Sequence, residues 1–195
     1  MRLAELSDGV FSIAMTLLVL ELHAPASAAI NSHEELLADL LAIAPKLAAW
    51  GMSFLTLGIF WVAQATQIET LRRSNRDQTW LHLAFLAAVS LVPFSTAVLG
   101  EFARFHLAMV VYWINIALLG VLLWFVWAHA KRNSMFVETW TPEMMAGVER
   151  RIVMSQSLYF VAMLVSMFGA IFGLLMMLVV QLNYAVAPRF GRWLS

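Results

Sequence analysis

Long runs of apolar residues, separated by short polar segments, are the dominant pattern along this chain of 195 residues. A helix needs about 20 mostly apolar residues to cross the hydrocarbon core of a bilayer. Backbone polar groups find no water there, so we expect such runs to be helical. Four runs meet this requirement, at residues 3–22, 47–66, 79–99 and 104–130.

The last apolar stretch, residues 152–187, is too long for a single span. Gly169 and Gly173 offer a place to turn, which divides it into spans at residues 152–168 and 170–187. Between the first and second spans, leucines at positions 36, 37, 40 and 41 fit one helical face. Residues 34–41 are therefore predicted to form a short helix along the membrane interface.

Composition supports this pattern, since 62% of the residues are hydrophobic, 12% are charged and the mean hydropathy is +0.81. Soluble domains are about 45–50% apolar and about 25% charged. The twelve acidic and twelve basic residues cancel, so nothing suggests a nucleic-acid partner. The chain has no Cys, which excludes disulfides and cysteine metal sites. We predict one all-α integral membrane domain over residues 1–195, with the lipid bilayer as its surroundings.

Basic residues predict how the six spans are oriented. Cytoplasmic loops carry an excess of Lys and Arg. With the N-terminus inside, only Lys46 and Arg104 fall outside, and both termini are cytoplasmic. Ten basic residues then share the cytoplasmic side: Arg2, Arg72, Arg73, Arg76, Lys131, Arg132, Arg150, Arg151, Arg189 and Arg192. An aromatic belt is predicted at the span ends from Trp50, Trp61, Trp80, Trp113, Trp124 and Trp127.

The apolar run that begins at Gly9 imitates a cleavable signal peptide. Glu5 and Asp8 stand where such a peptide would be positively charged. We therefore interpret the segment as a membrane helix that the mature protein retains.

The first span is unusual because polar side chains enter it. Asp8, Ser12 and Thr16 are four residues apart and lie near one helical face. Beside it, large aliphatic side chains at 13, 17 and 20 form a second face. Ionisable groups within a span are costly, which makes this span the candidate functional element.

Structural interpretations of the same residues stay open. Ser7 and Asp8 suit the cap of a helix that begins at the cytoplasmic interface. The hydroxyls of Ser12 and Thr16 can bond back to carbonyls of the preceding turn. The aliphatic face can pack against another helix or against lipid.

Two other function classes fit parts of this pattern. A small proton-coupled secondary transporter would use Asp8 with His82 or His106, although these histidines fall at opposite membrane faces in the six-span topology. An enzyme would need a catalytic cluster or metal ligands, and no span holds a His-x-x-x-His pair or paired carboxylates. We expect neither an enzyme nor a metal site.

The run Arg2…Leu6-Ser7-Asp8-Gly9-Val10-Phe11-Ser12-Ile13-Ala14-Met15-Thr16-Leu17-Leu18 resembles the first-helix signature of the transmembrane protein 175 family. That signature is Arg, three residues, Phe-Ser-Asp, three residues, a small residue, Ile, two residues and Thr. Residues 83–101 are similar to the third helix of the bacterial members. Leu6 stands where the family has Phe, and Gln64 stands where it often has His.

The resemblance implies a potassium-preferring cation channel in a bacterial inner membrane. Four identical subunits would surround a central pore lined by their first helices, with permeant K⁺ and no cofactor. A ring of aliphatic side chains can close such a pore by dewetting, and no Thr-Val-Gly-Tyr-Gly filter is present. By position, the resemblance assigns a constriction to Ile13, Leu17 and Leu20, neighbouring hydroxyls to Ser12 and Thr16, and a cytoplasmic polar network to Arg2, Ser7 and Asp8.

Overall fold

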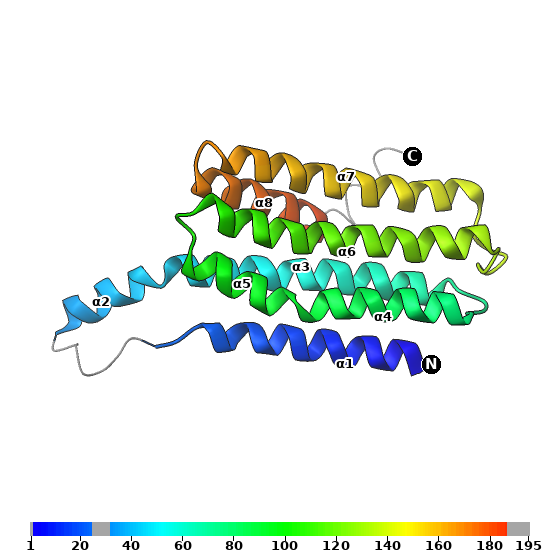
Figure 1. The fold of residues 1–195 in the computed structure, drawn as a ribbon, viewed down its shortest axis with the longest axis horizontal. Coiled ribbons are helices and arrows are strands. Elements are labelled where there is room, and N and C mark those ends of the chain that lie inside the picture. Colours follow the sequence, from blue (N-terminus) through cyan, green and yellow to red (C-terminus); the bar gives the residue numbers. More distant parts are fainter. Residues whose placement is uncertain (1, 25–31, 187–195) are drawn as a thin grey trace.

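The computed structural model describes residues 2–24 and 32–186, and these residues form helices that run side by side along one long axis (Figure 1). In chain order the elements are α1 (Arg2–Leu17), the 3₁₀ turn η1 (Leu18–Glu21), α2 (His33–Ala42), α3 (Ala44–Glu69), α4 (Arg76–Ser90), α5 (Val92–Glu101), α6 (His106–Arg132), α7 (Pro142–Ser166) and α8 (Ala170–Val186).

Four segments of the described chain are long and apolar enough to cross a membrane. They are Arg2–Glu21, Ala44–Glu69, Arg76–Glu101 and His106–Arg132. Each overlaps one of the four long runs predicted from the sequence to within a few residues at either end. Helices satisfy their own backbone hydrogen bonds, as a lipid environment requires.

The third of these segments is interrupted within the predicted run of residues 79–99. α4 ends at Ser90 and α5 begins at Val92, with Pro93 in the first turn of α5. Proline has no N–H to donate, and its ring clashes with the carbonyl four residues earlier. The helix therefore breaks at Leu91 while the chain continues in the same general direction (Figure 1).

α7 is longer than the predicted span of residues 152–168. It begins ten residues before Ile152, at Pro142, where the Thr141 side chain accepts a hydrogen bond from the Met144 backbone N–H at 3.4 Å. A side-chain cap followed by proline in the first turn favours a helix start. The charged residues Glu149, Arg150 and Arg151 are thus helical.

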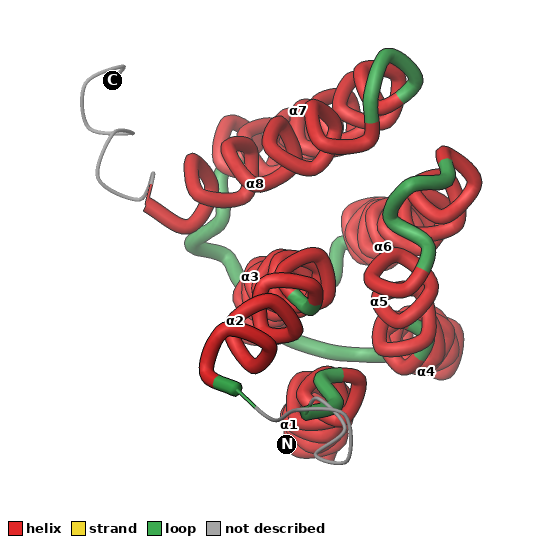
Figure 2. The backbone as a smooth tube through the Cα atoms, turned by 90° about the vertical axis from the view of Figure 1, so that its left-hand side faces the viewer, coloured by secondary structure: helices red, strands yellow, loops and turns green. Residues whose placement is uncertain are grey.

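α3 lies at the centre of the bundle, as the end-on view shows (Figure 2). α3 packs against α5 and α8, α6 packs against α4, α5 and α7, and α7 packs against α8. α1 lies at one edge, against α4 and α3. The core between the helices is apolar and includes the fully buried side chains of Leu57, Phe85, Tyr112, Ile116 and Leu119.

The end of the bundle where α1 begins also holds the α3–α4 and α6–α7 connections (Figure 1). An isolated β-bridge joins Leu71 to Phe136, and Lys131 forms a 2.8 Å ion pair with Glu149. Eight of the ten basic residues that the structure describes belong to this end, whereas Lys46 and Arg104 belong to the other. Arg189 and Arg192 lie outside the described residues.

Trp127 departs from the predicted aromatic belt. Its side chain is only 1% exposed, and its ring lies 4.6 Å from that of Phe136 and 5.6 Å from that of Trp140. The connection that follows α6 folds back over it. Trp127 is therefore a core residue of this end and not an interfacial anchor.

Gly173 allows α7 and α8 to approach closely after their turn. A Cβ at this position would lie 2.4 Å from Ser166 Cβ, 2.9 Å from Ser166 Cα and 3.0 Å from the Ala162 carbonyl oxygen. Most of these atoms are backbone or attached to it, so they cannot move aside easily. We expect Gly173→Ala to lower the free energy of unfolding by about 1–3 kcal/mol, because overpacking forces the helices apart.

Chemical unfolding in detergent micelles measures this effect. Gly58→Ala in α3 is the matched control, since nothing lies within 4 Å of a Cβ built there. That variant should be neutral or slightly more stable, because Ala is the better helix former by about 1 kcal/mol. Equal stability of the two variants would contradict the proposed close contact.

Candidate functional site

α1 has one buried face and one uncovered face. Ser7, Phe11, Ala14 and Leu18 are buried, and their spacing of three or four residues places them on one side of the helix. Phe11 packs near Phe85 of α4, with ring centroids 6.2 Å apart. α1 is thus fixed to the bundle by one face only.

The uncovered face carries the residues predicted to form the pore. Ile13, Leu17 and Leu20 are 61%, 43% and 64% exposed in the single chain. Ser12 and Thr16 are also exposed. The structure therefore brings the predicted aliphatic and hydroxyl residues together on one surface. Their role in conduction stays a prediction.

Thr16 uses its hydroxyl within its own helix. Its Oγ1 donates to the Ser12 carbonyl at 3.0 Å and to the Ile13 carbonyl at 2.9 Å. This is the bonding to carbonyls of the preceding turn that the sequence allows for a hydroxyl at this position. A hydroxyl oxygen that donates its proton still has lone pairs with which to accept or coordinate.

Two adjacent polar residues attach α1 to α3. The Ser7 hydroxyl donates to Gln64 Oε1 at 2.5 Å, and Trp61 Nε1 donates to Asp8 Oδ1 at 2.8 Å. Both residues lie well inside α1, which begins at Arg2, so the interpretation of Ser7 and Asp8 as a helix cap is wrong. They instead fix the position of α1 at two points.

Gln64 extends this attachment into the bundle. Its Nε2 lies 3.4 Å from His82 Nδ1, and the other ring nitrogen of His82 lies 3.4 Å from Gln78 Nε2. Gln78 Nε2 also donates to the Val126 carbonyl at 3.2 Å. All three of these side chains are fully buried. Polar contacts therefore run from α1 through α3 and α4 to α6.

Arg2, the third predicted member of the cytoplasmic network, is not joined to this chain of contacts. Its side chain is exposed and makes no hydrogen bond or ion pair with any residue that the structure describes. Its place in the network stays a prediction.

Neither histidine considered for the transporter interpretation contacts Asp8. His82 is linked to Ser7 only through Gln64. His106 begins α6 at the opposite end of the bundle (Figure 1). A relay through Asp8 and both histidines has no continuous route among the described side chains.

A second polar cluster lies inside the bundle, nearer the other end. Thr96 donates to Ser53 at 2.7 Å, Ser53 donates to the Tyr112 hydroxyl at 3.2 Å, and Gln181 donates to Thr56 at 2.6 Å. Thr56 also lies 3.1 Å from the Tyr112 hydroxyl. The cluster ties α3, α5, α6 and α8 together. Sequence reasoning missed this cluster, because single hydroxyls in apolar helices are common.

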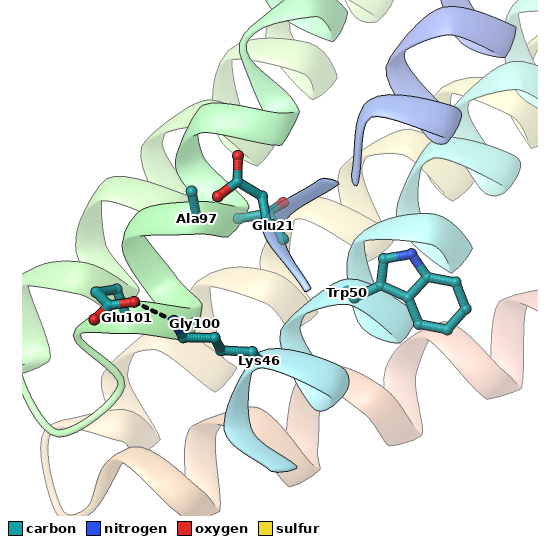
Figure 3. Close-up of a pocket in the computed structure, with 7 residues that line it drawn as sticks. Glu21, Lys46, Trp50, Ala97, Gly100 and Glu101 are labelled. Atoms are coloured by element: carbon teal, nitrogen blue, oxygen red, sulfur yellow. Dashed lines mark ion pairs between the residues drawn. The ribbon is translucent and has the colours of Figure 1, made fainter. Parts of the chain in front are cut away.

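A small pocket lies where η1 meets α3 and α5 (Figure 3). Lys46 forms an ion pair with Glu101 here, and Glu21 lines the same pocket. A Cβ at Gly100 would lie 3.3 Å from Lys46 Cα, so α3 and α5 approach closely at this point. The pocket at the η1 end of α1 is thus acidic, because it is lined by two carboxylates and one ammonium group.

Removing the indole N–H at Trp61 should weaken the attachment of α1. Trp61→Phe keeps an aromatic ring but leaves Asp8 without its donor, and we expect a loss of about 1 kcal/mol in unfolding free energy. Trp124→Phe is the control, since Trp124 is 40% exposed against 42% for Trp61 and has no such bond among the described residues. Thermal unfolding in micelles measures both, and equal melting shifts would contradict a role for the bond.

The fold and this surface define a class: an all-helical, multi-pass membrane protein whose first helix is attached by a polar contact network and uncovered on its other side. The model of a family described as "Endosomal/lysosomal potassium channel TMEM175" matches residues 2–93. The chain belongs to the TMEM175 family. The resemblance inferred from the sequence is therefore confirmed. Members of this family are ion channels and not enzymes, as predicted.

Known relatives match the sequence of this chain over part of their own length. A potassium channel of Streptomyces collinus is 34% identical over 137 residues, which are 68% of this chain and 65% of that protein. A potassium channel of Chamaesiphon minutus is 34% identical over 101 residues, or 52% and 49% of the two chains. The human endosomal/lysosomal proton channel TMEM175 is 31% identical over 108 residues, or 53% of this chain and 21% of that protein. The matched segments thus span between a fifth and two thirds of these relatives.

The fold is similar over nearly the whole chain. The crystal structure of a lysosomal potassium-selective channel TMEM175 homolog from Chamaesiphon minutus matches with a TM-score of 0.82 at 24% identity. The match covers 96% of this chain and 97% of that one. The predicted fold class is confirmed as an all-helical membrane protein with this fold.

Proposed function

We propose that this chain is one subunit of a potassium-preferring cation channel, in which the first helices of four copies line a central pore. The observation that carries the proposal is the asymmetry of α1, which is anchored on one face and uncovered on the other. The uncovered face holds the hydroxyls of Ser12 and Thr16 among aliphatic side chains. Polar groups in a membrane helix generally face protein or water. A pore formed between copies of the chain surrounds this face with both water and neighbouring protein.

In this proposal the aliphatic side chains close the pore and the hydroxyls favour potassium. Ile13 forms the narrowest ring, and Leu17 and Leu20 form further rings. Residues three apart eclipse in a 3₁₀ helix, so η1 supports a stack of Leu20 over Leu17. Such rings gate by dewetting. Potassium sheds water more easily than sodium, so weak coordination by hydroxyl oxygens beside the ring suffices for a modest preference.

The polar contacts at the start of α1 hold the pore helices in register. Ser7 and Asp8 fix each α1 to α3, and Arg2 belongs to the same cytoplasmic end. The exposed carboxylate of Asp8 also raises the local concentration of cations at the inner mouth.

We further propose six spans with both termini in the cytoplasm of a bacterium. The four long apolar segments supply four spans, and the α7–α8 hairpin supplies two. The gathering of basic residues at the end where α1 begins supports a cytoplasmic location for that end. α8 has 17 residues, or about 25 Å of helix, close to the core thickness of about 30 Å.

Thiol labelling in intact cells tests this orientation, because the chain has no native Cys. Arg104→Cys lies in the connection before α6, and Thr139→Cys lies in the connection before α7; both positions are exposed. A membrane-impermeant maleimide should label Arg104→Cys in intact cells and Thr139→Cys only after permeabilisation. The reverse pattern would invert the topology.

Flux measurements in proteoliposomes that contain only this protein test the channel itself. We expect potassium efflux that exceeds sodium efflux, rises without saturation and needs no proton gradient. Saturating flux that a proton gradient drives would instead support the alternative, a small proton-coupled secondary transporter. Absence of any cation flux would reject both.

A further inference from the structure

α2 is the helix of the described chain that stands apart from the bundle. None of its residues is buried, although it directly precedes α3 with only Ile43 between them. Ser32 caps its start by accepting a hydrogen bond from the Glu35 backbone N–H at 3.1 Å. It projects beyond the ends of the spanning helices and leans toward the side on which α1 lies (Figures 1 and 2).

The two faces of α2 differ sharply in chemistry. At 100° per residue its leucines cover an arc of about 140°, the width of a helix-packing stripe. The carboxylates of Glu35 and Asp39 occupy the opposite side, and Glu34 lies at the edge of the leucine face. The exposed fractions of Leu36, Leu37, Leu40 and Leu41 are 38%, 59%, 44% and 65%.

The sequence pattern predicts a helix over residues 34–41 that lies along the membrane interface, but the geometry of α2 makes the bilayer a poor partner for this leucine face. α3 has 26 residues, or about 39 Å of helix, which already exceeds the hydrocarbon thickness of about 30 Å. α2 extends outward from the N-terminal end of α3, away from that core (Figure 1). Helices that lie on membranes carry Lys and Arg on their polar face. α2 has three carboxylates and no Lys or Arg, and anionic lipid repels such a face.

We propose that the leucine face of α2 packs against the leucine faces of α2 in neighbouring copies of this chain, forming a collar beyond the bundle. The partner is a second copy because the assembly brings identical apolar faces together at the same height. The carboxylates of α2 then stay in water, where charged groups are solvated. This proposal rests on the proposed oligomeric channel, in which α1 places the same end of each subunit near a common axis.

Disulfide trapping tests the collar, since any introduced Cys is the sole thiol of the subunit. Leu40→Cys stands near the centre of the leucine face. Ala38→Cys, about 160° around the helix, is the matched control. Both positions are exposed, so neither change disturbs a core. Because a disulfide needs Cα atoms within about 7 Å, mild oxidation should link subunits in Leu40→Cys several-fold more than in Ala38→Cys.

Native mass spectrometry and potassium flux on the same samples separate the two proposals. An oligomer that conducts potassium but gives equal or no linking in the two variants overturns the collar and leaves the channel standing. A protein that is monomeric and passes no potassium overturns the channel and the collar with it. A solvent-sensitive dye on Leu40→Cys that is quenched by brominated lipid tails would show membrane contact and also overturn the collar.

Discussion

Ile13→Ala is expected to raise the single-channel potassium current and to bring the potassium and sodium permeabilities closer together. Ile13 is 61% exposed on the uncovered face of α1, so its truncation creates no hole in the subunit core. In the proposed pore each of the four subunits loses the three carbon atoms beyond Cβ from its side chain in the narrowest ring. A wider, less apolar ring is easier to wet. A barrier lower by about 1.4 kcal/mol corresponds to a current on the order of tenfold larger.

Planar-bilayer recordings measure both quantities, and the chain offers a matched control. Ile114 is the same residue type, is 55% exposed and lies on α6, which packs mainly against α4, α5 and α7. Ile114→Ala should leave the current and ion preference unchanged. If Ile13→Ala also leaves them unchanged, Ile13 does not line the conduction path.

The location of the helices follows from the sequence because composition alone dictates it. A run of about 20 apolar residues has no stable alternative to a helix in lipid. Helix ends are less well specified by hydropathy. α7 begins at Pro142 because Thr141 and the proline favour a start there, although the apolar stretch begins only at Ile152. α4 and α5 separate at Leu91 because Pro93 interrupts the hydrogen-bond ladder within a uniformly apolar run.

Which polar side chains meet depends on how the helices pack, and the sequence does not reveal that. Ser7 and Asp8 stood out because a charge within a span is rare, but their partners Gln64 and Trp61 did not. Trp61 looks like an interfacial anchor until α1 is placed beside it. His82 is buried against Gln64 and Gln78 only because α3, α4 and α6 share one interface.

The resemblance to the family compensates for part of this gap. It singles out Gln64 as a position where relatives often have His, and Gln64 is the residue that receives the Ser7 hydroxyl. The amide carries one acceptor and two donors, so it can serve Ser7 and His82 at once. The substitution therefore preserves a hydrogen-bonding group where α1 meets α3.

Gln64→Leu is expected to have the second large effect, because it breaks the polar contacts that run from α1 to α6. The Ser7 hydroxyl and the His82 ring would each lose a partner while staying buried. An unsatisfied buried polar group costs about 1–3 kcal/mol. We expect a comparable loss in unfolding free energy. Because the Asp8–Trp61 bond is then the one described polar contact left between α1 and α3, we also expect irregular or reduced potassium current.

Gln67→Leu is the control that separates loss of stability from loss of pore position. Gln67 is 3% exposed on the same helix and donates to the Leu123 carbonyl at 3.3 Å, without a bond to α1. It should lower stability while leaving the current normal. If Gln64→Leu and Gln67→Leu give identical currents, the Ser7–Gln64 bond does not position α1.

A double-mutant cycle then measures the bond itself. Ser7→Ala removes the hydroxyl, so adding it to Gln64→Leu should cost less than it costs in the unchanged protein. Hydrogen bonds between membrane helices average about 0.6 kcal/mol in such cycles and reach about 1.7 kcal/mol. A 2.5 Å bond between two buried partners belongs in the upper part of that range. A coupling energy near zero would mean that α1 is positioned by the packing of Phe11, Ala14 and Leu18 alone.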